Sequence, residues 1–151
     1  MPATTKTEPT FFAFDPIDKS FCLEQLCTSN YQKLFKLIPG LPNIQGTATG
    51  FAPRQSELHV VLIDRSIYTL TLRLSYCFEK NQLAHAEPDV IVRVYLDAQL
   101  AEVLSDHTRE RVSQVFKPES SIAIMNYKWR LNYFLQKWLD LCLSKNYQFD
   151  M

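Results

Sequence analysis

Side chains that could bind a ligand or transfer protons are densest in one stretch of the chain. Arg93, Tyr95 and Asp97 alternate along a predicted strand, Glu102 follows them, and Arg73 occupies the corresponding face of the preceding strand. A carboxyl group with a raised pKa in a closed pocket can act as a general acid or base. On an open sheet face the same residues form cross-strand ion pairs, each worth well under ~1 kcal/mol. The spacing favours the ion pairs and leaves the polar pocket as the alternative.

The sequence motifs of several common enzyme classes are missing. His85 and Glu87 match the H-x-E of zinc deaminases, but the P-C-x-x-C that completes that metal site is absent. G-x-S-x-G, H-E-x-x-H, G-x-G-x-x-G and G-K-S/T do not occur, and the chain has 3 glycines in all. We therefore predict no catalytic residue, no metal site and no cofactor. The chemistry expected of this chain is binding, with an enzyme using Asp97 or Glu102 as the alternative.

The net charge bears on nucleic-acid binding, and the cysteine spacing bears on disulfides and zinc sites. Lys plus Arg and Asp plus Glu each number 16, so the formal net charge is zero, whereas tight nonspecific nucleic-acid binding needs clustered positive charge. Cationic and aromatic residues do alternate on the last predicted helix, which leaves nucleic-acid binding as a second alternative to a solvated helix face. The residues concerned are Lys128, Trp129, Arg130, Tyr133 and Lys137. The 4 cysteines match no disulfide or zinc framework, so we expect reduced thiols.

Hydrophobic periodicity predicts the elements that position these side chains. Apolar residues recur at three- and four-residue spacing near both ends of the chain and alternate strictly between them, as amphipathic helices and half-buried strands require. Helices are predicted at 19–38 and 127–145, strands at 58–63, 66–78 and 90–96, and short candidate strands at 47–51 and 111–116. Two amphipathic helices can cover one face of such a sheet, which predicts an α+β fold. The expected architecture is a two-layer sandwich, with four to five antiparallel strands flanked by an N-terminal and a C-terminal helix.

Several local features are predicted less directly. Asp18 or Ser20 can cap the first helix and Asn126 the last, since their side-chain oxygens accept free backbone N–H groups. Asp64-Arg65 is expected to turn the chain between two strands. Residues 98–105 fit either a helix or a strand.

The chain ends and overall length indicate one domain. We expect a flexible tail at 1–16 and a single domain at 17–151. The apolar run Phe11–Phe14 is too short for a signal peptide, and no stretch is long enough to span a membrane. These features predict a cytoplasmic protein.

Three segments resemble the YqiB family of bacterial cytoplasmic proteins, a family of unknown function. The segment 26–39 is similar to L-C-x-x-N-Y/F-x-x-L-x-x-L-L-P, 92–103 to V-R-x-Y-H-D-A-x-x-A-E-V, and 131–143 to x-N-x-F-L-x-x-W-L-x-x-C-L. The resemblance runs from about Leu23 to Tyr147. It implies a cytoplasmic setting and favours a strand at 101–104, but it transfers no activity. Leu96 stands where the family pattern has His, which argues against a hydrolase built on that His.

The resemblance also singles out Asn30 and Asn132, which occupy motif positions. Asn30 lies at the edge of the apolar stripe of the first helix, so we expect a buried amide bonded to sheet or loop backbone. The candidate binding residues are Asn30, Arg73, Arg93, Tyr95, Asp97 and Glu102. The expected function is a non-enzymatic module, a monomer or homodimer, that binds an unidentified protein or small ligand. Nucleic acid and membrane are not the expected partners.

Overall fold

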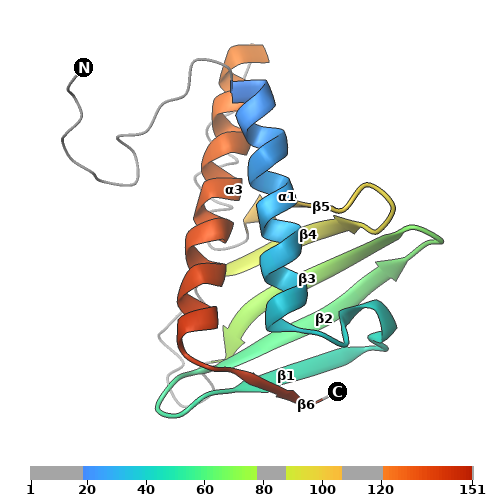
Figure 1. Cartoon of the computed structure of the whole chain (residues 1–151), viewed down its shortest axis with the longest axis vertical. Helices are drawn as coiled ribbons and strands as arrows, with labels where there is room; N and C mark the ends of the chain where they lie inside the picture. The colour runs from blue at the N-terminus through green and yellow to red at the C-terminus, as the bar shows by residue number, and fades with distance from the viewer. Residues whose placement is uncertain (1–18, 78–87, 107–120, 151) are drawn as a thin grey trace.

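Two long helices lie side by side across one face of an antiparallel sheet (Figure 1). The structure, a computed structural model, describes residues 19–77, 88–106 and 121–150. The helices are α1 (Lys19–Leu37) and α3 (Ser121–Ser144), and a single 3-10 turn, η3 (Leu41–Asn43), follows α1. The strands are β1 (Thr47–Phe51), β2 (Glu57–Arg65), β3 (Thr69–Cys77), β4 (Asp89–Tyr95), β5 (Leu100–Asp106) and β6 (Gln148–Asp150).

The sheet has the strand order β5-β4-β3-β2-β1-β6, and every neighbouring pair is antiparallel. This arrangement confirms the predicted α+β sandwich, with six strands in the described sheet where four to five were expected. β6 is the added strand. It has three residues, and it reaches β1 because α3 returns the chain to that edge, which no local pattern reveals.

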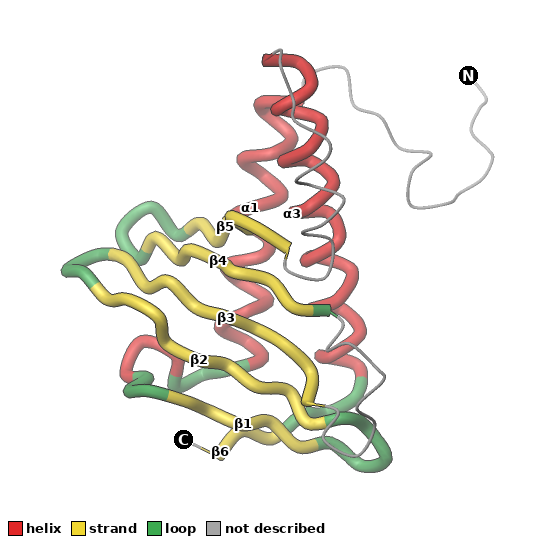
Figure 2. The backbone as a smooth tube through the Cα atoms, turned by 180° about the vertical axis from the view of Figure 1, so that it is seen from behind, coloured by secondary structure: helices red, strands yellow, loops and turns green. Residues whose placement is uncertain are grey.

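Alternation along the strands divides the sheet into a covered face and an open face. Leu70, Leu72 and Leu74 are fully buried beneath the helices, as are Val92 and Val94 on β4. The side chains between them point to the opposite face, because successive strand residues point in opposite directions. Figure 2 shows that face toward the viewer, with no described helix or strand lying over it. We call the outward side chains of β1–β5 the open face.

The helix boundaries correct two predictions. α3 begins at Ser121, six residues before the predicted start at 127, so Asn126 lies inside the helix and does not cap it. The N-terminal end of α3 extends past β5 (Figure 1), and Ile122 and Ile124 are exposed there. Without burial this end has no apolar stripe to reveal it. Ser20 likewise lies inside α1, and Asp18 is outside the described residues.

The turn between β2 and β3 also differs from its prediction. Asp64 and Arg65 belong to β2, and the chain turns at 66–68. A β-bulge between Leu62 and Asp64 shifts the register, and the Arg65 guanidinium donates hydrogen bonds to the carbonyls of Pro42 and Ile44. These contacts extend the strand beyond the point where its apolar alternation ends.

The ambiguous segment at 98–105 resolves as a turn at 96–99 followed by strand β5. This outcome agrees with the strand favoured at 101–104. The candidate strand at 111–116 and the predicted tail at 1–16 lie outside the described residues. Within the described parts, neither helix combines the length and apolar character needed to cross a membrane.

Candidate functional site

The open face brings four of the predicted binding residues onto three neighbouring strands. Arg93 on β4 lies between Thr71 on β3 and Glu102 on β5, and Arg73 lies opposite Ile91. Tyr95 is two residues beyond Arg93 on the same face of β4. Register therefore places two guanidinium groups, a phenol and a carboxylate in the β3–β5 half of the sheet.

Arg73 forms an ion pair with Asp89. Its Nε donates to Asp89 Oδ1 at 2.8 Å and its Nη2 to Oδ2 at 2.5 Å, a bidentate geometry. Asp89 is 6% exposed although it belongs to the open face. The hydrogen bonds that Arg73 donates to this carboxylate raise the pKa of Arg73. An Arg–Asp or Arg–Glu pair across these two strands was expected, and its acidic member is Asp89, which was not among the candidate residues.

Glu102 is held by two donors from different elements. Lys128 of α3 approaches its Oε2 at 3.2 Å, and the Tyr95 hydroxyl donates to its Oε1 at 3.4 Å. The Glu102 side chain is 22% exposed, so its carboxylate is half-buried between these donors. The pair links the open face to the helix layer around the edge strand β5.

Arg93 differs from Arg73 because none of the described carboxylates forms an ion pair with it. Its Nε donates a long hydrogen bond of 3.4 Å to Thr71 Oγ1. Throughout the described ranges no carboxylate lies within ion-pair distance of Arg93, although Glu102 is its neighbour in register. The two terminal nitrogens of this half-buried guanidinium are available to a ligand.

Asp97 is not part of this group. It lies exposed in the hairpin turn between β4 and β5, and its Oδ1 accepts a hydrogen bond from the Ala98 backbone at 2.9 Å. Gln99 closes the same turn through a hydrogen bond to the Tyr95 carbonyl and adopts a positive φ of 60°. The carboxylate of Asp97 stabilises its own turn, as Asp commonly does.

Asn30 belongs to a separate network between the helices and β5. It is fully buried, and its Nδ2 donates to the Asn132 carbonyl at 3.1 Å. The partner is therefore helix backbone and not the sheet or loop backbone that was expected. Asn132 is the centre of this amide network. Its Oδ1 accepts from the Val103 N–H at 2.9 Å and from the Cys27 thiol at 3.7 Å, and its Nδ2 donates to the Lys128 carbonyl at 2.9 Å.

The buried thiols are poor nucleophiles. Burial, reinforced by the Glu102 charge, raises the pKa of Cys27 to about 12. Burial also raises the pKa of Cys142 to about 11. Both residues and the half-buried Cys22 are free thiols. Because the thiolate is the reactive form, neither buried cysteine suits catalysis near neutral pH.

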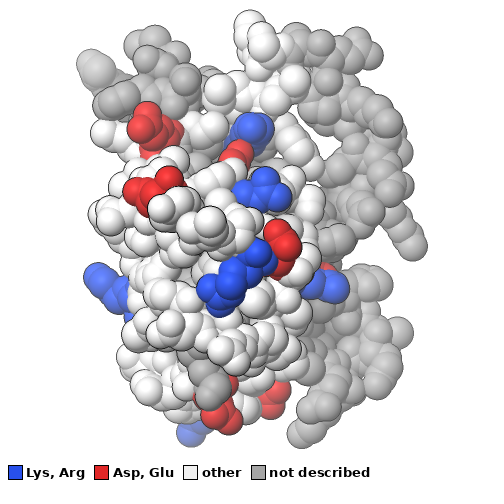
Figure 3. All heavy atoms as spheres, turned by 90° about the vertical axis from the view of Figure 1, so that its right-hand side faces the viewer, with Lys and Arg blue, Asp and Glu red and all other residues white. Residues whose placement is uncertain are grey.

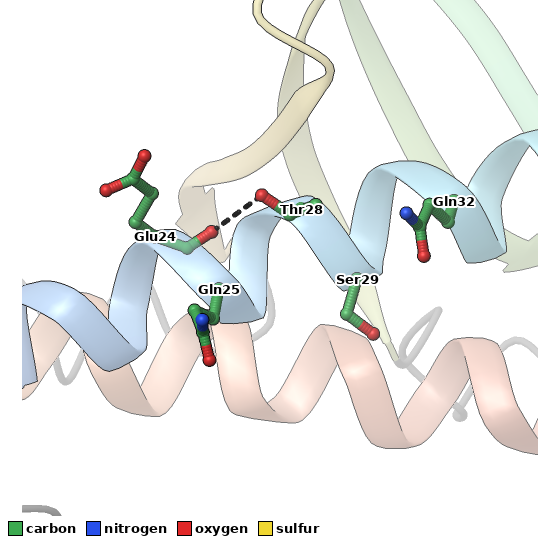
Figure 4. Close-up of a pocket in the computed structure, with 5 residues that line it drawn as sticks. All are labelled: Glu24, Gln25, Thr28, Ser29 and Gln32. Carbon is green, nitrogen blue, oxygen red and sulfur yellow. Dashed lines mark hydrogen bonds between the residues drawn. The ribbon is translucent and has the colours of Figure 1, made fainter.

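A shallow hollow on α1 is a weaker candidate. Its lining residues are Glu24, Gln25, Thr28, Ser29 and Gln32, all from one helix (Figure 4). Thr28 Oγ1 donates to the Glu24 carbonyl at 3.0 Å, and Gln136 of α3 approaches Ser29 Oγ at 3.5 Å. Such one-sided polar surface, with Glu24 as its only charged lining residue, is typical of a solvated helix. No cluster of three metal-ligating side chains occurs in the described part of the chain.

The surface gives little support to nucleic-acid binding. On the side shown in Figure 3, cationic and acidic side chains are interspersed and form no single-sign patch. On α3, the Trp129 and Tyr133 rings stack at 5.7 Å, and Lys137 lies 5.4 Å from the Tyr133 ring centre. Trp129 is buried and Tyr133 is half-buried, so these two rings do not present the open faces on which nucleic-acid bases stack.

Comparison with known proteins places the chain in a family. The model of a protein family of unknown function, DUF1249, matches residues 33–148. The chain is 25% identical over 126 residues to the uncharacterized protein YqiB of Escherichia coli strain K12, covering 80% of this chain and 85% of that protein. The YqiB proteins of strains O6:H1 and O157:H7 match equally. No solved structure matches. The chain therefore belongs to the DUF1249 family of proteins of unknown function.

Proposed function

We propose that this protein is a non-enzymatic module that binds a protein partner through the open face of its sheet. The observation that carries the proposal is an uncovered sheet face, among the described elements, on which Arg93 keeps unused donors. Rigid strands on a buried core hold its side chains in place, which lowers the entropy lost on binding.

The shape of this surface supports a protein over a small ligand. The side chains form rows across several strands, such as Val61, Arg73 and Ile91 on β2, β3 and β4. Small ligands are usually bound in concave, mostly apolar pockets, whereas protein interfaces combine apolar, aromatic and Arg side chains on extended surfaces. The open face has that mixed composition.

The arrangement of the carboxylates does not favour the acid–base alternative. Asp97 is exposed and bonded within its turn, while Glu102 is ion-paired to Lys128. A general acid or base must reach the proton that it transfers. Binding through the open face requires neither residue to act in this way.

Site-specific photo-crosslinking in cells of the source organism tests the proposal. A benzophenone amino acid replaces Val61, which lies half-buried on the open face, or Gln32, which is exposed on α1. We expect a discrete cross-linked protein from the Val61 position that is absent from the matched Gln32 control. The adduct mass distinguishes a second copy of this chain from a different protein.

Two results would overturn the proposed function. One is the absence of any discrete protein adduct at Val61. The other is the same set of adducts from Gln32, which would show contact without preference for the open face. Circular dichroism and urea unfolding of each labelled variant establish that the sheet is intact before either result is read.

A further inference from the structure

We infer that the partner bound by the open face supplies an acidic side chain that pairs with Arg93. This inference rests on the proposed function and names the chemistry of its partner. It follows from a comparison of the charged groups on the open face. The carboxylates nearest to Arg93 are paired with other residues, and Asp64 lies two strands away from Arg93.

The carboxylates closest to Arg93 are already hydrogen-bonded to other residues. The Asp89 carboxylate accepts both donors of Arg73, and the Glu102 carboxylate accepts from Lys128 and Tyr95. Asp64 is exposed on β2 and is separated from Arg93 by strand β3, where Thr71 is its register partner. Within the described residues, the Arg93 guanidinium is therefore half-buried and has no carboxylate to neutralise its charge.

The position of Arg93 makes an unpaired charge unusual. It lies inside the sheet, on β4, between Ile91 and Tyr95 along its own strand. A fully exposed cation is well hydrated, but a guanidinium flanked by side chains of the two neighbouring strands loses part of its hydration. A partner that covered this face without a counter-charge would leave the charge buried and unpaired, at a large cost in affinity.

The geometry favours a carboxylate over a phosphate. Arg93 engages Thr71 through Nε, which leaves its two terminal nitrogens for a planar, singly charged carboxylate. A phosphate group carries more charge and is usually held by several cations or by backbone N–H groups. Here the register neighbour is the acidic Glu102, which disfavours a dianion. The expected partner segment carries Asp or Glu beside an apolar side chain that contacts Ile91.

Selection of short random peptides displayed on phage tests this inference on the full-length protein. The immobilised chain is panned with the Arg93→Gln protein present as a soluble competitor, which removes peptides indifferent to Arg93. We expect selected peptides to share an Asp or Glu. Synthetic peptides with that acid should bind at least about tenfold more tightly than their Asn or Gln counterparts. The peptide substitution leaves the protein unaltered, so misfolding cannot explain the difference.

Three protein variants complete the test by fluorescence anisotropy. Arg93→Gln should weaken peptide binding at least about tenfold, and Arg93→Lys should weaken it less, since it keeps the charge but not the fork. Arg130→Gln removes an equal charge from the exposed face of α3 and should leave affinity unchanged.

The inference is overturned if selection yields no shared acid, if it yields no binder at all, or if the Arg93→Gln protein binds the peptides as tightly. The cross-linking experiment separates this failure from that of the proposed function. A protein adduct at Val61 without any acid requirement keeps the open face as the binding surface and removes Arg93 as its selective contact. Loss of the adduct itself removes both.

Discussion

The amide network between the helices and the charged groups of the open face use similar polar chemistry in different surroundings. Asn132 is fully buried, and each side-chain heteroatom has a protein partner. Asn30 Oδ1 accepts no hydrogen bond from any described residue, but it is buried beyond the reach of a ligand. Arg93 also lacks full pairing, and it lies half-buried at an open surface. Unused hydrogen-bonding capacity indicates binding where a partner can approach it.

The amide network should therefore contribute most to stability. Asn132→Leu keeps a similar volume but removes the acceptor for the Val103 N–H, which then remains buried without a partner. We expect a loss of about 2–4 kcal/mol in the free energy of unfolding, because an unsatisfied buried donor carries its full desolvation cost. Urea unfolding followed by circular dichroism measures this loss. Gln32→Leu, at an exposed position of α1, is the control and should change stability by less than about 0.5 kcal/mol.

A small effect of Asn132→Leu would contradict this view of the network. It would mean that the Val103 N–H finds water once the amide is removed. The edge strand β5 would then be held mainly by its pairing with β4 and its packing beneath the helices.

On the open face itself, the paired arginine should matter more to stability than the unpaired one. Arg73→Met keeps the aliphatic stem but leaves the Asp89 carboxylate buried without its cation. Because Arg73 itself is half-exposed, we expect a moderate loss of about 1–2 kcal/mol. The measurement is again the urea midpoint, with Arg130→Met, at an exposed position of α3, as the charge-matched control. Equal stability of both variants would show that the bidentate pair is as weak as an ordinary surface pair.

The buried thiol gives the amide network a distinctive pH dependence. Folding raises the pKa of Cys27 from 9.0 to about 12, so the folded state holds this proton more tightly than the unfolded chain. The stabilisation is complete below pH 9 and decreases as pH rises from about 9 toward 12. Urea midpoints measured across this range should fall less steeply for Cys27→Ala than for the native chain. Parallel slopes would show that Cys27 does not contribute to the alkaline loss.

The sequence was sufficient to predict the helices and strands that bury one face against the opposite layer of the sandwich. Strict alternation over β3 predicts its two faces, and the apolar stripes of α1 and α3 predict the helix layer. The boundaries that failed, such as Ser121, lie where the element is not buried. β6 could not be foreseen because three residues carry no period, and its pairing depends on where α3 ends.

The partners of the polar residues were harder to predict than the faces they occupy. Arg73, Arg93 and Tyr95 were correctly grouped by strand alternation, but Asp89 was missed as the partner of Arg73. That pairing depends on the register between β3 and β4, which alternation along each strand does not specify. The role of Asn132 requires knowing that β5 is an edge strand with an outward N–H for α3 to satisfy. Its place next to Leu131 on an apolar stripe was the available signal.

Arg93→Gln has the smallest expected effect on stability, and it best distinguishes a role in folding from a role in binding. Arg93→Gln removes a single long hydrogen bond to Thr71 and no ion pair, so we expect a change of at most about 0.5 kcal/mol in the free energy of unfolding. Urea unfolding beside Arg73→Met measures it under identical conditions. A loss above about 1.5 kcal/mol would make Arg93 a structural residue and weaken its assignment to a partner. A negligible loss leaves the sheet holding a half-buried guanidinium that its own stability does not require, which is the property expected of a residue retained for binding.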